Sequence, residues 1–403
     1  MGKYKNLIFN EFCTDAWTEL KNSSLPILIY GMGNGADKII SYFEKYGIEY
    51  HDVFASDGFV RGHSFRGKTV LSYSQAREKY KQGFDIVVSF GSKLPDVIEK
   101  IYSLEENHKV YALDVPVCGD CLFNYEFFCE HENDLLTARE LLYDDISKNT
   151  FDDIVRFKIS GKLKYLKSTT FSENELDSLL QVEKYEVYAD LGAYNGDTIK
   201  KYLSICPNLK RIYAFEPDTR NFRKLSAYCD NICDVEFVLL NSPACDSDKD
   251  IEFFLSGNRN SSGAGTASFE HKKIILQGKA LDSVANNIDF IKYDVEGLEY
   301  DALMGSKKII SSSAPDLLVS MYHKSEDMYT LPLLVNKLNS RYKLYLRRLP
   351  YIPAWDLNLY AINENIGQWC PIFLYYGYVE RIKYFSIDWR INFKQIVLNF
   401  IAN

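Results

Sequence analysis

The chain has 403 residues, of which 46% are hydrophobic, and it carries a formal net charge of −8. This composition is that of a globular chain, and the length exceeds what one hydrophobic core usually supports, so we expect two domains with shorter appendages. The acidic balance, with no basic block in the sequence, disfavours a protein that binds nucleic acid through its phosphates.

The first segment, residues 1–24, is predicted to form one short helix. Leu7, Ile8 and Phe12 fall on one side of it at helical spacing. A polar Asn-Ser-Ser run that ends at Ser24 breaks the pattern.

Residues 25–115 are predicted to form a first α/β domain. Apolar runs alternate with helical segments, which favours a parallel, doubly wound sheet. Gly31, Gly33 and Ala36 follow the first run with the G-x-G-x-x-(G/A) spacing of a nucleotide-binding turn. The predicted strands are Ile27–Tyr30, Tyr50–Ala55, Phe84–Phe90 and Val110–Leu113.

Two interpretations of this first domain stay open. In the first it binds a nucleotide, with Asp57 on a ribose about 20 residues after the turn. The segment resembles the amino-terminal domains of bacterial sugar-nucleotide acyltransferases, which implies a nucleotide-sugar ligand. In the second it is a Rossmann-like domain kept for packing or for docking a partner.

Residues 116–182 are predicted to form a helical bridge between the domains. Cys118, Cys121, Cys129 and His131 read C-x-x-C-x7-C-x-H, a set of soft ligands that suits a structural zinc ion. The same segment also has the pattern of an aromatic packing helix, and the two interpretations stay open.

The stretch around which the chain is organised is Tyr185–Pro217. An apolar run ends on Asp190, a turn with two glycines leads into a helix, and a second apolar run ends on Glu216. This order predicts nucleotide binding at the carboxyl edge of a parallel sheet, with Glu216 accepting both ribose hydroxyls. The spacing D-x-G-x-x-x-G differs from the dinucleotide pattern, and Asp190 suits a cationic or amino-bearing ligand.

These residues resemble motifs one and two of the class I S-adenosylmethionine (SAM)-dependent methyltransferases. The run IDFIKYDVEGLEYDALMGSKKII, Ile288–Ile310, is similar to the K-x-D-V-E-G-x-E signature of the FkbM family, and Tyr322–Asp327 and Tyr342–Leu349 resemble further segments of it. The likeness covers Glu183–Ile362 and implies a seven-stranded sheet with a final antiparallel hairpin. The predicted fold class is therefore α/β, a class I methyltransferase domain at 183–362 preceded by a smaller doubly wound domain.

The resemblance implies a SAM site along the carboxyl edge of this second sheet. Cys245 and Asp246 follow the third strand, where the fold places the adenine; Asp246 is a candidate for the exocyclic amine or an ordinary solvated acid. The predicted cofactor-binding residues are Asp190, Gly192, Ala193, Tyr194, Gly196, Asp197, Glu216, Pro217, Cys245, Asp246 and Asp294.

The predicted catalytic residues are Asp294, Glu296 and His323, which follow the fourth and fifth strands. A sugar hydroxyl is barely acidic, so a base is expected, and Asp294 or His323 fits that role with Glu296 orienting the acceptor. Glu299 fits a charge at the start of a helix. Two alternatives stay open: Asp294 anchors the methionine end of SAM, or the three residues bind a divalent metal that acidifies the hydroxyl.

Two further segments complete the prediction. Asp250–Lys279 is a polar β-rich insertion whose glycine- and serine-rich centre suits a lid over the site. Residues 363–403 form an aromatic extension, long enough for a docking arm or for the contact of a homo-oligomer.

The function predicted from these features is O-methylation of a sugar, nucleotide-sugar or glycan-linked hydroxyl by an FkbM-like SAM-dependent methyltransferase. The nine scattered cysteines are an odd number, which is typical of free thiols in the cytoplasm, and no apolar stretch is long enough to span a bilayer. The rivals are an NAD- or nucleotide-sugar-dependent enzyme that uses the first domain, and a non-catalytic assembly protein.

Overall fold

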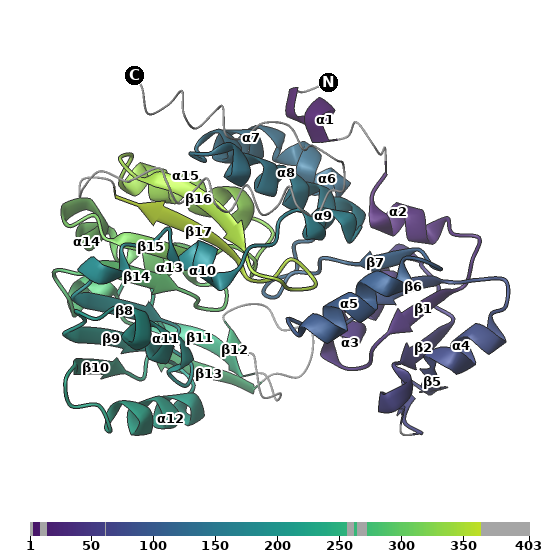
Figure 1. Ribbon diagram of the computed structural model, residues 1–403, viewed down its shortest axis with the longest axis horizontal. Helices are drawn as coiled ribbons and strands as arrows, with labels where there is room; N and C mark the ends of the chain where they lie inside the picture. Colours follow the sequence, from purple (N-terminus) through teal and green to yellow (C-terminus); the bar gives the residue numbers. More distant parts are fainter. Residues whose placement is uncertain (1–2, 9–13, 61, 256–261, 264–271, 364–403) are drawn as a thin grey trace, which may run out of the picture. The chain divides into compact units, whose positions relative to one another are not determined.

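The computed structural model describes residues 3–8, 14–60, 62–255, 262–263 and 272–363 (Figure 1). One compact unit, Met1–Glu364, contains all of them. The centre of the predicted lid and the extension after residue 363 lie outside the described residues.

The N-terminal sheet is parallel and has five strands in the order β5-β2-β1-β6-β7. The order reverses between β1 and β6, which is where open α/β sheets form a crevice at their carboxyl edge. Its strands are β1 (Ile27–Tyr30), β2 (Asp52–Ala55), β5 (Leu71–Ser72), β6 (Asp85–Val88) and β7 (Val110–Ala112), and the small hairpin beside it is β3 (Ser64–Phe65) with β4 (Lys68–Thr69).

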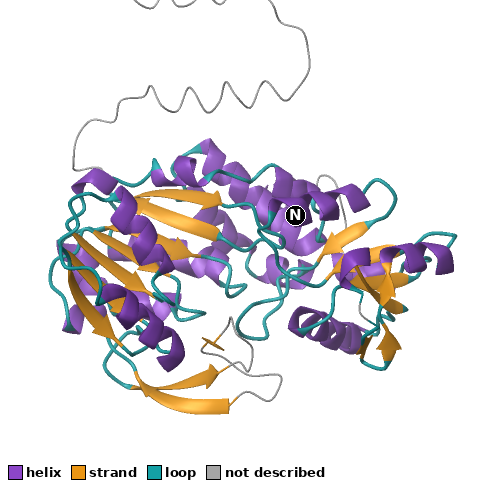
Figure 2. Ribbon diagram, turned by 60° about the horizontal axis from the view of Figure 1, so that its bottom comes forward, coloured by secondary structure: helices purple, strands orange, loops and turns teal. Residues whose placement is uncertain are grey.

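Helices flank the strands of both sheets (Figure 2). The apolar runs of β1, β2 and β6 are buried along their whole length, as strands covered on both faces must be. Two short helices, rather than the single one expected, precede this sheet. The helices of this region are α1 (Lys3–Ile8), α2 (Ala16–Lys21), α3 (Asn34–Tyr46), η1 (Asp57–Phe59), α4 (Tyr73–Lys79) and α5 (Pro95–Leu104).

The bridge is helical and contacts both sheets. Near the end of α8, Lys158 forms a buried ion pair of 2.6 Å with Asp114, just beyond β7. At the start of the same helix, Asp144 caps α8 and pairs with Arg347 of the second sheet at 2.6 Å. The bridge helices are α6 (Tyr125–Glu130), α7 (Glu132–Glu140), α8 (Asp145–Ser160), α9 (Lys164–Lys167), α10 (Glu173–Asp177) and η2 (Val182–Lys184).

The second sheet has seven strands in the order β10-β9-β8-β14-β15-β17-β16, and β17 is antiparallel to both of its neighbours. This confirms the predicted class I methyltransferase fold. The strands are β8 (Val187–Leu191), β9 (Arg211–Phe215), β10 (Glu236–Leu240), β14 (Phe290–Tyr293), β15 (Asp316–Ser320), β16 (Lys343–Arg348) and β17 (Leu357–Ile362).

The segment after Gly297 forms two helices, because the chain turns at Gly305 and Ser306. A side chain at Gly305 would overlap the carbonyl oxygen of Cys245, so the backbone approaches this loop closely. The helices are α11 (Asp197–Ile205), α12 (Thr219–Cys229), η3 (Leu281–Ser283), α13 (Glu299–Met304), α14 (Lys307–Ser312) and α15 (Asp327–Leu338), and a small sheet contains β11 (Asp250–Leu255), β12 (Ser262–Gly263) and β13 (Lys272–Gln277). Among the described helices, none has the length and apolar character needed to cross a membrane.

Candidate functional site

Three neighbouring strands of the second sheet, β8, β14 and β15, end at the same edge. Gly192 follows β8, Asp294 follows β14, and His323 comes shortly after β15. Gly192 has a φ of +93°, and a side chain there would overlap the carbonyl oxygen of Asp294. This glycine is therefore needed for close backbone packing, which lets the loops after β8 and β14 lie side by side.

Asp190 and Lys292 form a buried pair across β8 and β14. They are direct partners in the parallel register, and their charged atoms are 3.2 Å apart. The Thr198 hydroxyl donates to the other oxygen of Asp190 at 2.5 Å. Burial raises the pKa of Asp190, and the nearby carboxylates keep Lys292 cationic by raising its pKa. Asp190 is fully buried and already paired with Lys292, and the expectation that it holds a cationic ligand stays a prediction.

Glu216 ends β9 at the same edge, with its carboxylate held by the backbone. One oxygen accepts the Tyr194 N–H at 2.9 Å and the other accepts the Asp218 N–H at 2.8 Å. Burial raises the pKa of Glu216 to about 7, although both hydrogen bonds act to lower it. The two oxygens keep further lone pairs for a ligand that offers two hydroxyls.

The turn between β8 and α11 is tight. Tyr194 and Gly196 have positive φ angles of 48° and 88°, and Gly196 caps the start of α11. Ala193 is buried, whereas Asp197, in the first turn of the helix, is exposed. Pro217 lies next to Glu216, and its carbonyl oxygen accepts the Asn241 amide at 3.2 Å.

Cys245 and Asp246 have partners within the protein. The Cys245 thiol is buried and donates to the carbonyl oxygen of Ser247 at 2.8 Å. Asp246 is exposed and pairs with Lys249 at 2.7 Å, and this hydrogen bond lowers its pKa. The expected contacts of Cys245 and Asp246 with the cofactor stay predictions, and of the two side chains only that of Asp246 is exposed.

Asp294 lies at the centre of the site and is about one-third exposed. Its Oδ1 accepts the Tyr322 hydroxyl at 3.2 Å, and its Oδ2 is 3.6 Å from the Lys292 ammonium. Burial acts to raise its pKa, but Lys292 and His323 hold it below its usual value. Asp294 is therefore a carboxylate at neutral pH.

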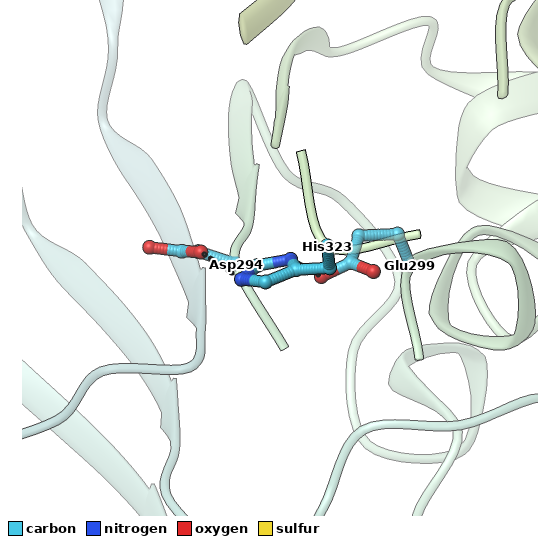
Figure 3. Close-up of side chains that lie close together, drawn as sticks. All are labelled: Asp294, Glu299 and His323. Atoms are coloured by element: carbon cyan, nitrogen blue, oxygen red, sulfur yellow. Dashed lines mark ion pairs between the residues drawn. The ribbon is translucent and has the colours of Figure 1, made fainter. Parts of the chain in front are cut away.

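His323 lies between Glu299 on one side and Asp294 on the other, as Figure 3 shows. Its Nδ1 is 2.9 Å from Glu299 Oε1, and its Nε2 is 3.6 Å from Asp294 Oδ1 and 3.6 Å from Glu296 Oε2. Burial acts to lower the pKa of His323, but the three carboxylates raise it to about 10. The raised pKa favours a protonated imidazole at neutral pH, and the expected role of His323 as a base stays a prediction.

Glu299 is buried inside the site, although its position at the start of a helix suggested an exposed charge. It is the first residue of α13, but its side chain is only 1% exposed. Its Oε1 accepts the Val295 and Gly297 N–H groups at 3.0 and 3.4 Å, so it fixes the D-V-E-G loop from inside as well as facing His323. Sequence reasoning gave Glu299 no role in the site, although it belongs to the signature.

Glu296 lies on the open side of this loop. Its φ is +53°, an unusual value for a residue with a side chain, and its side chain is 34% exposed. Burial raises its pKa to about 7, with Asp294 and Glu299 adding to the rise and His323 opposing it.

The bridge reaches this loop through Cys118. Its thiol donates to the Glu296 carbonyl at 3.1 Å and its N–H donates to the His323 carbonyl at 2.9 Å. Cys129 is exposed and His131 stacks on Tyr329, so the cysteines and His131 do not gather as a zinc site. The aromatic-helix interpretation is the one that fits, because Phe127 and Phe128 of α6 are buried.

The glycine turn of the first sheet packs closely on the chain at Gly31 and Gly35, whereas Gly33 faces open space. A side chain at Gly31 would meet Phe90, and one at Gly35 would overlap the Ser89 carbonyl. Asp57 accepts the Ser74 N–H and hydroxyl at 3.1 and 2.8 Å, in the first turn of α4, whose N-cap is Ser72; its expected contact with a ribose stays a prediction.

The carboxyl edges of the two sheets lie next to each other. Ser92, after β6, exchanges backbone hydrogen bonds of 2.9 and 3.0 Å with Ile352, in the loop that follows β16. Gly91 packs against Trp355 of the same loop, and a side chain there would meet its ring. The first sheet therefore borders the site on the second.

Part of this chain matches the model of one protein family. Residues 190–378 match the family model described as the Methyltransferase FkbM domain. No curated protein matches the chain significantly in sequence.

One solved structure shares the fold of most of this chain. A crystal structure of methyltransferase FkbM from Methylobacillus flagellatus KT superposes with a TM-score of 0.62 at 18% identity, covering 86% of this chain and 92% of that one. A precorrin-6y C5,15-methyltransferase from Geobacter metallireducens GS-15 gives a TM-score of 0.32 at 8% identity, covering 47% of this chain and 87% of that one. The first likeness spans most of the described chain and shows a shared fold; the second is too weak to carry an argument.

Proposed function

We propose that this chain, whose residues 190–378 match the FkbM methyltransferase domain, is a methyltransferase that transfers the methyl group of SAM to a hydroxyl on a sugar, nucleotide-sugar or glycan. The observation that carries the proposal is the shared edge at which Glu216, Asp294 and the glycine turn meet. This edge is the ligand site of open α/β sheets.

The cofactor half of the site is the turn after β8 together with Glu216. The positive-φ turn brings backbone to the edge without long side chains, and Glu216 offers two anchored oxygens for the ribose hydroxyls. The remaining predicted contacts, including Asp246 and Asp294, are proposals of the same kind.

The acceptor half is the acidic group after β14. In the reaction the acceptor oxygen forms a bond to the methyl carbon as the carbon–sulfur bond breaks. S-adenosylhomocysteine leaves as a neutral thioether, and the hydroxyl loses its proton. Asp294 and Glu296 are partly exposed and negatively charged or nearly so, so they attract that proton, whereas the protonated His323 holds them in place.

The class of acceptor is supported by the neighbouring first sheet. We propose that an acceptor with two parts, such as a nucleotide-sugar, contacts both domains, because the carboxyl edges of the two sheets adjoin at Ser92 and Ile352. The free cysteines of the described residues fit the cytoplasm, where nucleotide-sugars are made.

The experiment is mass spectrometry of nucleotide-sugars and glycans from cells with and without the protein. We expect one defined species to gain the mass of one methyl group, and to gain three deuterons more when the cells' SAM carries a CD3 group. Identical sugar and glycan profiles from the two cell lines would reject the acceptor class.

A further inference from the structure

The first residues of the bridge contact the two loops that carry the acidic and histidine side chains of the site. The Cys118 thiol donates to the Glu296 carbonyl at 3.1 Å, and the Cys118 N–H donates to the His323 carbonyl at 2.9 Å. One bridge residue is therefore bonded both to the D-V-E-G loop, residues 294–297, and to the loop after β15. These two loops hold all three predicted catalytic residues.

The packing around Gly297 shows how close this contact is. A side chain at Gly297 would bring its Cβ to 2.9 Å from Cys118 Cβ and 3.1 Å from Lys324 Cε. The φ angles of Glu296 and Gly297 are +53° and +92°, so two successive residues have a left-handed conformation. For Glu296 this conformation is strained, and it persists only when the surroundings hold it. Glu299 supports the loop from inside, and Cys118 supports it from outside.

The Cys118 thiol stays in the protonated form that can donate. Burial raises its pKa, and the carboxylates of Glu296 and Glu299 add to this rise, whereas Lys38 and Lys324 oppose it. A thiol is a weak hydrogen-bond donor, so it fixes a loop only if its own backbone is held firmly.

Lys38 of α3 holds the backbone on which Cys118 sits. Its ammonium donates to the carbonyl oxygens of Pro116 at 3.1 Å and Val117 at 2.8 Å, the two residues before Cys118. On the other side of Cys118, the carbonyl oxygen of Cys121 accepts the Ser325 hydroxyl at 2.7 Å. A continuous set of hydrogen bonds therefore runs from α3 of the first domain, through the bridge, to the D-V-E-G loop.

We propose that Cys118 is a positioning residue for methyl transfer, which holds Glu296 in place, and that Lys38 acts through Cys118 by fixing residues 116–117. The first domain then supports the acceptor half of the site, a role that requires no ligand in that domain. The proposal rests on the proposed function for the reaction that the loop serves. Because a displacement of about 1 Å can slow a reaction about 100-fold, weakening this support should reduce the rate of methyl transfer.

Hydrogen–deuterium exchange of the full chain, measured on peptides by mass spectrometry, reports how firmly the D-V-E-G loop is held. Cys118→Ala and Lys38→Met should each speed exchange in the peptide containing residues 295–298 at least about fivefold. Cys118→Ser keeps a donor and should stay within about twofold of wild type. The double variant should exchange no faster than Cys118→Ala, because both changes remove the same support.

The matched controls are Cys129→Ala and Lys45→Met. Cys129 is an exposed cysteine of the bridge, and Lys45 is an exposed lysine of α3. Both variants should exchange in the D-V-E-G loop as the wild type does. Circular dichroism during heating shows whether each variant is folded, and Lys38→Met still tests the proposal if Cys118→Ala does not fold.

Methyl transfer supplies the measurement that a purely structural role would not change selectively. The probe is SAM with a CD3 group, added with the purified chain to a small-molecule extract of cells that lack the protein. Cys118→Ala should label its product at least about tenfold more slowly than wild type, while its Kd for SAM stays within about twofold. Cys118→Ser should recover the rate to within about threefold of wild type.

Three results would overturn the proposal. The first is wild-type exchange of the D-V-E-G loop in folded Cys118→Ala and Lys38→Met, and the second is a serine variant as slow in labelling as the alanine variant. The third is an equal loss of SAM affinity and labelling rate, which indicates a general disturbance of the site. If wild type labels no compound in the extract, the proposed function is rejected, and the exchange measurement still decides whether Cys118 and Lys38 hold the loop.

Discussion

At the scale of single residues, Lys292 compensates the buried negative charge of Asp190 and lies 3.6 Å from Asp294. Lys292→Met leaves Asp190 as an unpaired carboxylate inside the sheet, so we expect a loss of about 3–5 kcal/mol in the free energy of unfolding. The measurement is urea unfolding of wild type, Lys292→Met and the double variant Asp190→Asn/Lys292→Met. The double variant should recover most of the loss, because the uncompensated charge is gone; a double variant as unstable as the single one would contradict this assignment.

Glu216 predicts a pH dependence of cofactor binding. Burial raises its pKa to about 7, so the carboxyl is mostly protonated at pH 6 and mostly ionised at pH 8. The ionised form accepts both ribose hydroxyls, so we expect SAM affinity to rise about tenfold from pH 6 to pH 8. The raised pKa of Glu216 also affects the free energy of unfolding of the ligand-free protein. The folded chain favours the protonated carboxyl, so this contribution to stability is present at low pH and is lost as the pH rises toward 7.

Calorimetry of SAM binding at several pH values checks this prediction. The control is Glu216→Gln, which keeps the shape of the side chain and removes the titrating group. Its affinity should be weaker than that of wild type at pH 8 and should not vary across the range. A wild-type curve that is flat, or that falls with pH, would exclude Glu216 as the ribose acceptor.

The sequence identified most of the residues that lie at the site but not what they contact. Asp294, Glu296 and His323 were found because polar side chains follow apolar strands. The role of Lys292 depends on which residue of β8 faces it, and the strand register that decides this is not visible in the sequence. Glu299 was interpreted as a charge at the start of a helix because the sequence shows only its position in the helix. Its burial and its contact with His323 arise only in the folded chain.

At the scale of elements, the packing of the β8 and β14 loops depends on Gly192. In Gly192→Ala the added Cβ meets the backbone of Asp294 in a conformation that side chains rarely adopt, so we expect a destabilisation of about 2–5 kcal/mol. Gly119→Ala is the matched control: its φ is also positive, +77°, but open space surrounds it, and about 1–2 kcal/mol is expected. Equal losses in thermal or urea unfolding would show that close packing is not the reason for Gly192.

The strands of both sheets were predicted well because buried parallel strands are short apolar runs between polar turns. The edge strand β5 was missed because it has only two residues, Leu71 and Ser72. The apolar spacing after Gly297 continues past Gly305, so the sequence does not show that this segment divides into α13 and α14. The break there comes from the approach of the Cys245 loop, a contact between segments far apart in the chain.

At the scale of the whole molecule, the methyltransferase sheet depends on the bridge. Arg348 is only 1% exposed and donates to the Leu166 carbonyl at 2.7 Å and to Thr170 at 3.0 Å, while Arg347 pairs with Asp144. A fragment of residues 183–363 would leave both arginines without these partners and expose the face of β16 that α8 covers. We expect it to lack cooperative unfolding.

The comparison for this prediction is the fragment of residues 1–363, which retains the bridge and should unfold cooperatively. Circular dichroism during heating distinguishes the two fragments. Cooperative unfolding of the shorter fragment within about 5 °C of the longer one would mean that the second sheet is an independent domain.

The most direct test of the account is calorimetric titration of the full chain with SAM, with Glu216→Ala as the paired variant. The account predicts saturable one-to-one binding to wild type with a Kd below about 1 mM, and binding at least about tenfold weaker in the variant. Absence of saturable SAM binding to folded wild-type protein at about 1 mM would contradict it.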